Sequence, residues 1–134
     1  AYKSELMKAE NQTHYKQTMF HGFDTDQTML RIGAMNLMLH GVDNPNISYQ
    51  DSLSADNTDA DRYTLCLANP PFAGTLDKEV ISKSLTAITK TTKTELLFVA
   101  LFVRMLQTGG RCASIVPDGV LFGTPMPTRH SARN

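Results

Sequence analysis

The stretch Arg62-Tyr63-Thr64-Leu65-Cys66-Leu67-Ala68, which runs directly into Asn69-Pro70-Pro71-Phe72, decides the fold of this chain. Residues 62–68 are a short run of β-favouring residues bounded by polar ones, a pattern typical of a buried strand. Two successive prolines lack the backbone N–H that a sheet ladder needs. We therefore expect a buried strand that ends at Ala68 and delivers the chain into a rigid loop.

The segments before this strand alternate between helix and strand patterns. Residues 1–13 are polar and helix-compatible, and residues 18–23 predict a short strand. A helix over residues 29–39 follows, with Gly41 supplying a left-handed end. We interpret its methionines as core filling. Three residues can cap the first turn of this helix, namely Asp24, Thr25 and Asp26.

Two further stretches lie before and after the strand predicted at residues 62–68 and its Asn-Pro-Pro-Phe loop. Residues 47–51 alternate apolar and polar side chains like a strand, and residues 52–61 form a polar loop. Residues 74–93 are rich in Thr, Ser and Lys without a clear period. They predict a mobile loop with one helical turn in it.

The last part of the sequence predicts a buried helix and a final strand. A helix through Leu106 is apolar nearly all round, begins at a Thr92 or Thr94 cap and is closed by Gly109-Gly110. Residues 111–116 predict a strand, and residues 117–119 a turn. The alternation of strands and helices predicts an α/β fold with a doubly wound, mostly parallel sheet.

Composition narrows the class of protein. The chain has 134 residues, 41% of them hydrophobic, which suits one domain with a single core. Thirteen basic residues balance thirteen acidic ones, so the chain has no net positive charge of the kind that would indicate nucleic-acid binding. The longest apolar run is too short for a membrane span and no secretory pattern is present, so we expect a cytoplasmic protein without a membrane partner.

The residues that commonly bind metals or form disulfides show no such pattern. Cys66 and Cys112 are isolated within apolar runs, which favours reduced core residues over a disulfide. The four histidines show no metal-ligand spacing with each other or with the cysteines. We therefore predict no metal site.

Three polar residues fall where a predicted strand ends, namely Asp24, Asp51 and Asn69. Ligands of open α/β sheets bind at the carboxyl ends of strands, where side chains and helix N-termini converge. Taken singly, Asp24 is explained equally well as a helix cap and Asp51 as a turn former. Asn-Pro-Pro-Phe directly after a buried strand is harder to explain as an ordinary loop.

The chain resembles a known enzyme family. Asn69-Pro70-Pro71-Phe72 is similar to the catalytic motif of amino methyltransferases. Its surroundings resemble the modification subunits of type I restriction systems, which are adenine-N6 DNA methyltransferases, over about residues 18–122. The other landmarks are the stretches 33–41, 67–74, 108–111 and 116–122.

The resemblance implies S-adenosylmethionine as the cofactor and assigns residues to it. Asp24 would bind the ribose hydroxyls, as acidic residues do in dinucleotide folds. Asp51 would accept a hydrogen bond from the adenine amino group. The family has a small and then an apolar residue after this acid, and Ser52 and Leu53 fit.

The resemblance also gives the motif a chemical role. The Asn69 side-chain oxygen and the Pro70 carbonyl would accept hydrogen bonds from the target amine and stabilise its developing positive charge. Phe72 would stack on an adenine flipped out of double-stranded DNA. Pro70 and Pro71 would hold the loop rigid.

Part of the family pattern is absent from this sequence. The glycine-rich loop and the first strand, which is central in the family sheet, have no counterpart among the eight glycines and their surroundings. We therefore expect residues 1–122 to be a partial catalytic domain of the S-adenosylmethionine-dependent, Rossmann-like type, inactive alone. Residues 123–134 depart from the family and predict a disordered tail. The implied partners are DNA and the specificity and restriction subunits.

Two alternatives stay open on the sequence alone. Asn-Pro-Pro before an aromatic residue also serves methyltransferases that act on protein glutamine or on RNA, although the stretch 35–41 and Phe72 argue against them. The second alternative is a non-catalytic interaction module that keeps the motif without the cofactor. Cofactor titration separates these classes.

Overall fold

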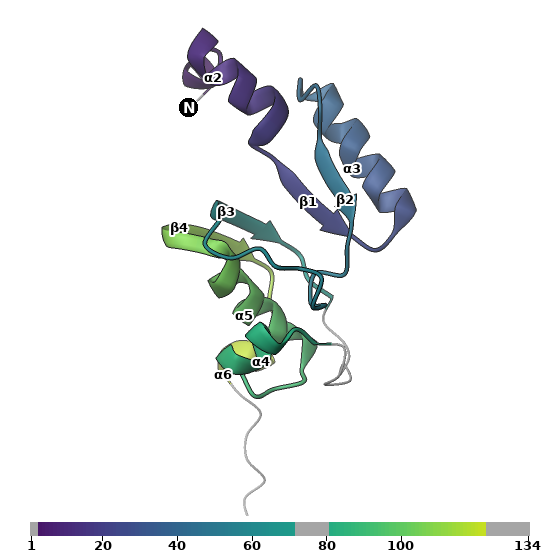
Figure 1. Ribbon diagram of the computed structural model, residues 1–134, viewed down its shortest axis with the longest axis vertical. Coiled ribbons are helices and arrows are strands. Elements are labelled where there is room, and N and C mark those ends of the chain that lie inside the picture. The colour runs from purple at the N-terminus through teal and green to yellow at the C-terminus, as the bar shows by residue number, and fades with distance from the viewer. Residues whose placement is uncertain (1–2, 72–80, 123–134) are drawn as a thin grey trace, which may run out of the picture. The chain divides into compact units, whose positions relative to one another are not determined.

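The structure, a computed structural model, describes residues 3–71 and 81–122 (Figure 1). The chain divides into two compact units, Ala1–Asn57 and Thr58–Asn134, and each is described by itself. Phe72 and the tail predicted at residues 123–134 lie outside the described residues. None of the described helices is both long and apolar enough to span a membrane.

The first unit is a parallel strand pair with helices around it. Its strands are in register from His21 opposite Asn46 to Asp24 opposite Tyr49. Gly22 on the first strand lets the Ile47 side chain approach closely, since a Cβ there would lie 2.6 Å from the end of that side chain, which would then have to shift. The elements are α1 (Lys3–Leu6), α2 (Ala9–Thr13), η1 (His14–Thr18), β1 (His21–Asp24), α3 (Gln27–Leu39) and β2 (Asn46–Tyr49).

Helix α3 begins and ends as the sequence predicts. Of the three candidate caps Asp26 is used, and its side chain accepts from the amides of Thr28 and Met29 at 2.7 and 3.2 Å. Gly41 follows the helix with φ +85°, a conformation that favours glycine. The helix packs on β1 and β2 and buries Leu30.

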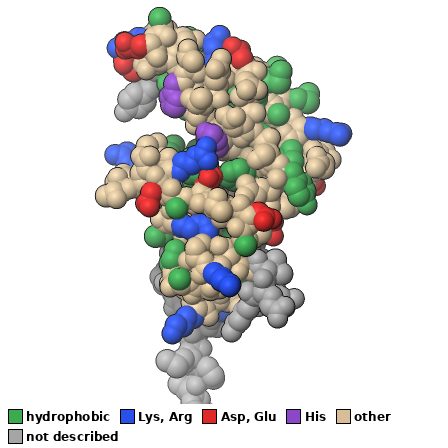
Figure 2. Space-filling view, in the orientation of Figure 1, with side chains coloured by type: hydrophobic (Ala, Val, Ile, Leu, Met, Phe, Trp, Pro, Cys, Tyr) green, Lys and Arg blue, Asp and Glu red, His purple; other side chains and the backbone are tan. Residues whose placement is uncertain are grey.

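The interpretation of the α3 methionines as core filling is wrong in this structure. Met35 is 63% exposed and Leu39 is 84% exposed, and hydrophobic side chains gather at the surface over this helix (Figure 2). A helix presents one face to the sheet on which it packs, and on α3 that face carries Leu30. The outer face is therefore apolar and exposed, with Met29, Ile32, Met35, Met38 and Leu39.

The second unit is also built on a parallel strand pair, and it holds the predicted motif. Cys66, Leu67 and Ala68 of one strand lie opposite residues 112–114 of the other. In the part of the chain that the structure describes, each strand of both units has a single strand partner. The elements are β3 (Tyr63–Ala68), α4 (Lys83–Ile88), α5 (Thr94–Met105), β4 (Leu106–Ser114) and α6 (Asp118–Phe122).

Strand β3 exists where the sequence predicts it, but it is not buried. Leu65 is 55% exposed and Leu67 is 73% exposed. Both lie on the same face of the strand, because side chains alternate along it. Composition indicated the strand correctly, but it could not show that one face of the pair has little cover.

The predicted end of helix α5 is wrong. The helix ends at Met105, Leu106 takes up an extended conformation, and β4 begins there without a connecting turn. Gly109 has φ +84°, and a Cβ on Gly110 would lie 2.9 Å from the Gln107 carbonyl oxygen. The two glycines therefore permit the irregular backbone of β4, where its register with β3 shifts, and they do not cap the helix.

Three smaller predictions in this unit also need correction. The N-cap of α5 is Lys93 without a side-chain hydrogen bond, so neither predicted threonine caps the helix. Helix α4 supplies six residues within the predicted loop. Residues 118–122 form helix α6 where a turn was predicted.

The core of the second unit lies on α5. Leu97 is fully buried, as is Leu85 of α4, which packs against α5. Ala100, Leu101 and Met105 are also buried, whereas Val103 is 63% exposed. The helix is therefore buried along one side and not all round.

Candidate active site

The two predicted acidic residues lie at one end of the first unit. Asp24 ends β1, and Asp51 follows β2 by two residues. The strands are parallel, so both residues lie at the carboxyl end of the pair. The Asp24 carbonyl accepts from the Gln50 amide at 3.1 Å, which extends the pairing to this end. We call Asp24 and Asp51 the acid edge.

Each carboxylate of the acid edge is held by one oxygen. Asp24 Oδ1 accepts from the Asp26 amide at 2.8 Å, and Asp51 Oδ1 accepts from the Leu53 amide at 3.0 Å. Both side chains are exposed. No described residue donates to the second oxygen of either carboxylate, so one acceptor on each is available to a ligand.

The two residues after Asp51 support the turn in different ways. Leu53 is only 3% exposed and belongs to the core of the unit. The Ser52 carbonyl accepts from the side-chain amide of Asn57 at 2.9 Å, and Asn57 is itself buried. Sequence reasoning missed Asn57, because an asparagine in a polar loop gives no signal of a contact five residues back.

The motif loop leaves the carboxyl end of β3 as predicted. The Ile115 amide donates to the Ala68 carbonyl at 3.2 Å, so the pairing with β4 continues to the residue before Asn69. The Asn69 side chain is exposed and has no hydrogen-bond partner among the described residues. Its amide is thus open to a ligand.

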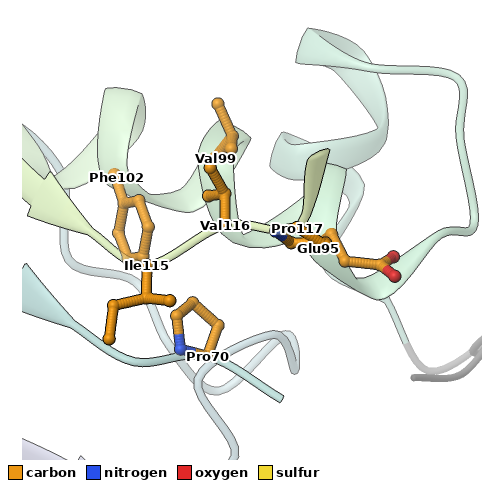
Figure 3. A pocket seen from close by; sticks show the side chains of 7 residues that line it. All are labelled: Pro70, Glu95, Val99, Phe102, Ile115, Val116 and Pro117. Carbon is orange, nitrogen blue, oxygen red and sulfur yellow. The ribbon is translucent and has the colours of Figure 1, made fainter. Parts of the chain in front are cut away.

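Pro70 fixes the loop by packing. It is buried, while Pro71 beside it is exposed. Its ring lies next to Ile115 with Phe102 nearby, in a shallow apolar depression of the second unit (Figure 3). The depression is lined by Pro70, Glu95, Val99, Phe102, Ile115, Val116 and Pro117, and the Glu95 carboxylate points away from Pro70.

A polar cluster anchors the other end of β3. The Tyr63 hydroxyl donates to Asp59 Oδ2 at 2.6 Å, and Arg62 pairs with Oδ1 at 2.8 Å. Arg104 of α5 donates to the Asp59 carbonyl at 3.1 Å and to the Ser84 hydroxyl at 2.6 Å. Burial, and then the hydrogen bond to Asp59, raise the pKa of Tyr63. This cluster ties β3 to α5 far from Asn69, and we assign it no chemistry.

The chain is similar to proteins of one enzyme family. The model of a family described as N-6 DNA methylase matches residues 2–129. The chain belongs to this family. It is 30% identical over 129 residues to the type I restriction enzyme EcoEI methylase subunit of Escherichia coli, which covers 95% of this chain and 26% of that protein.

Other relatives agree with the family and with the fold. The chain is 28% identical to the type II restriction enzyme and methyltransferase RM.BcgI of Heyndrickxia coagulans, over 88% of this chain and 18% of that one. The crystal structure of the type I restriction enzyme EcoKI M protein matches with a TM-score of 0.76 at 23% identity, over 91% of this chain and 27% of that one. The prediction of a partial Rossmann-like methyltransferase fold is thereby confirmed, and the chain spans about a quarter of the length of its type I relative.

Proposed function

We propose that residues 1–122 are part of the catalytic domain of an adenine-N6 DNA methyltransferase, the modification subunit of a type I restriction-modification system. The observation that carries the proposal is the Asn69-Pro70-Pro71 loop at the carboxyl end of β3, with the Asn69 amide exposed and Pro70 buried. Membership of the N-6 DNA methylase family supports the reaction class.

The acid edge fits the adenosine half of S-adenosylmethionine. A ribose diol donates hydrogen bonds, and Asp24 offers an exposed carboxylate oxygen to accept them. Asp51 offers the same to the adenine amino group. Ser52 and Leu53 hold the turn that aims Asp51, through the Ser52 carbonyl and the Leu53 amide. When bound, the cofactor supplies the methyl group.

The motif loop fits an aromatic amine as methyl acceptor. The lone pair of such an amine is delocalised into the ring, which makes the nitrogen a poor nucleophile. The Asn69 side-chain oxygen and the Pro70 carbonyl would both accept from its N–H groups. The nitrogen is then drawn toward a tetrahedral geometry, and its developing positive charge is stabilised. No described side chain with a shifted pKa is needed as a base.

The packing of the loop supports this role. Two hydrogen bonds to one nitrogen act only if their acceptors hold their geometry closely. The buried Pro70 ring and the Ile115–Ala68 hydrogen bond supply that rigidity on both sides of Asn69. We assign Phe72 to stacking on the flipped adenine, an interaction worth roughly 1–3 kcal/mol per base.

The proposed partners are double-stranded DNA and the other subunits of a type I complex. Several relatives are named as type I restriction enzyme methylase subunits, which supports a multi-subunit assembly. The chain carries no net charge, with thirteen basic and thirteen acidic residues. DNA contacts outside the target pocket are therefore assigned to the partner subunits or to the rest of the protein.

A methyl-transfer assay on the complete protein with its partner subunits tests the proposal. Labelled S-adenosylmethionine should convert adenine in duplex DNA to N6-methyladenine, and Asn69→Ala should slow formation of the product by about 100-fold or more. Transfer of the label to a protein glutamine or to RNA instead of DNA would overturn the substrate. Phe72→Ala should reduce the fluorescence rise of 2-aminopurine at the target position, which reports the flipped base.

A further inference from the structure

The two cysteines of the chain lie directly opposite each other. Cys66 of β3 and Cys112 of β4 are register partners in the parallel pair. Neighbouring strands run about 4.7–4.9 Å apart, and disulfide-bonded cysteines usually have Cα atoms about 4.4–6.8 Å apart. Register partners also project to the same face of a sheet. The backbone therefore places both thiols where one bond can join them.

The two thiols are accessible to reagents, and the sequence has no third cysteine that could form a disulfide with either of them. Both cysteines are free thiols in this structure, Cys112 exposed and Cys66 partly buried. They are the only two cysteines of the sequence. Burial raises the pKa of both thiols, and Cys112 raises that of Cys66 further, as a nearby second thiol does. Neither thiol is activated on its own, so their proximity is the feature that matters.

We propose that Cys66 and Cys112 form a dithiol site that a small-molecule disulfide, such as oxidised glutathione, converts to an intramolecular cross-strand disulfide bond. The Cys112 thiolate attacks the reagent, forms a mixed disulfide and releases one thiolate. The Cys66 thiolate then attacks the Cys112 sulfur and releases the second. Two protein thiols lose two electrons and two protons, and one disulfide reagent is reduced to two thiols.

The bond would form close to the motif loop. Cys66 precedes Asn69 by three residues on the strand that carries it. Closing the bond would tie β3 to β4 at this point in addition to their ladder. This inference does not depend on the proposed methyltransferase activity, because it follows from the strand register alone.

Mass spectrometry of the chain after treatment with oxidised glutathione at alkaline pH tests the proposal. Wild type should lose the mass of two hydrogen atoms and carry no glutathione. The matched control is the double variant Cys112→Ser with Ala113→Cys, which moves the thiol one residue along β4 and so to the opposite face. When wild type has closed, this variant should still carry glutathione on both cysteines, because it closes more slowly.

The rates of closure decide the outcome. Without denaturant, wild type should close at least about tenfold faster than the shifted variant, since only register partners share a high effective concentration. In urea the two should close at the same rate. Wild type that keeps two glutathiones, or equal rates without denaturant, would overturn the proposal.

A second pair of variants guards against a shifted variant that does not fold. Cys66→Ser and Cys112→Ser each leave one thiol, and each should take up a single glutathione that stays attached. Circular dichroism checks that the variants keep their secondary structure. Loss of the glutathione from a single-cysteine variant without added reductant would show that closure onto a second thiol is not what releases it, and the proposal would fail.

Discussion

The acid edge of the first unit and the motif loop of the second unit occupy equivalent places but are held in different ways. Each lies at the carboxyl end of a parallel strand pair. Asp24 and Asp51 are exposed and are held by hydrogen bonds to their own turns. Asn69 is positioned by the buried ring of Pro70 and by the last hydrogen bond of β3. This difference fits the roles that we propose, because an acid edge that binds a polar ligand needs reachable acceptors, whereas a motif loop that activates an amine needs acceptors that do not move.

The main helices of the two units differ in how many of their residues are buried. Helix α3 buries only Leu30, whereas α5 buries six residues, from Thr94 to Met105. The packing that stabilises the second unit is therefore concentrated on the helix that also supports Pro70. Substitutions of buried residues on α5 should lower the free energy of unfolding, and substitution of Asn69 should lower the methylation rate. Substitutions on the outer face of α3 should have little effect on stability.

The largest effect is expected at Leu97, which is fully buried on α5. Leu97→Ala should lower the free energy of unfolding by about 2–5 kcal/mol, because it removes apolar contacts and leaves a cavity. Urea unfolding of the chain measures this loss. Val103→Ala on the same helix is the control, since that side chain is 63% exposed and should matter far less. Equal losses would show that the packing of α5 is wrongly described.

Asn69→Ala should lower the single-turnover methylation rate of the complete enzyme by about 100-fold or more, the loss typical of removing one hydrogen-bonding group that stabilises transition-state charge. Thr64→Ala, at an exposed position earlier on β3, should leave the rate unchanged. A loss below about tenfold would contradict the role assigned to the Asn69 amide.

A smaller effect is expected at Pro70, and it separates the two prolines. Pro70→Ala removes a buried ring and loosens the loop, which should cost about 1 kcal/mol, or roughly fivefold in rate. Pro71→Ala changes an exposed ring and should cost less. Rates measured side by side at saturating cofactor decide this. A larger loss at Pro71 would place the support of the loop elsewhere.

The smallest effect is expected on the outer face of α3. Met35 is 63% exposed, so Met35→Gln should change the free energy of unfolding by no more than about 0.5 kcal/mol. The same urea titration of the chain reports it. A loss above about 1 kcal/mol would show that another surface covers this face.

Local sequence features predicted the elements well and their surroundings less well. Asp26 and Gly41 bound α3 because capping and left-handed conformations depend on single residues. The strand before Asn69 and its break at Pro70 were predictable for the same reason. Whether Met35 or Leu67 is covered depends on partners distant in sequence, and no local pattern encodes them.

The site shows the same division. The chemistry of Asp24, Asp51 and Asn69 was suggested by residue type at strand ends and by resemblance to the family. Two residues of their surroundings were not predicted: Phe102, which lines the same depression as Pro70, and Asn57, which donates to the Ser52 carbonyl. The Gly109-Gly110 pair was misassigned because glycines that end a helix and glycines that permit an irregular strand look alike in sequence.

We propose that the acid edge binds the cofactor and that the motif loop binds the acceptor base. The most direct test of these separate roles is the cofactor affinity of two variants of the complete enzyme, measured by calorimetric titration with S-adenosylmethionine. Asp24→Asn keeps an oxygen for the Asp26 amide but replaces the second oxygen with an NH₂ group that cannot accept from a ribose. Affinity should fall by about 10- to 100-fold, the value of a hydrogen bond to a charged group. Asn69→Ala should leave the affinity within about twofold of wild type, because in the proposed mechanism its amide binds the acceptor base and not the cofactor. Equal weakening by both variants, or none by Asp24→Asn, would contradict the account.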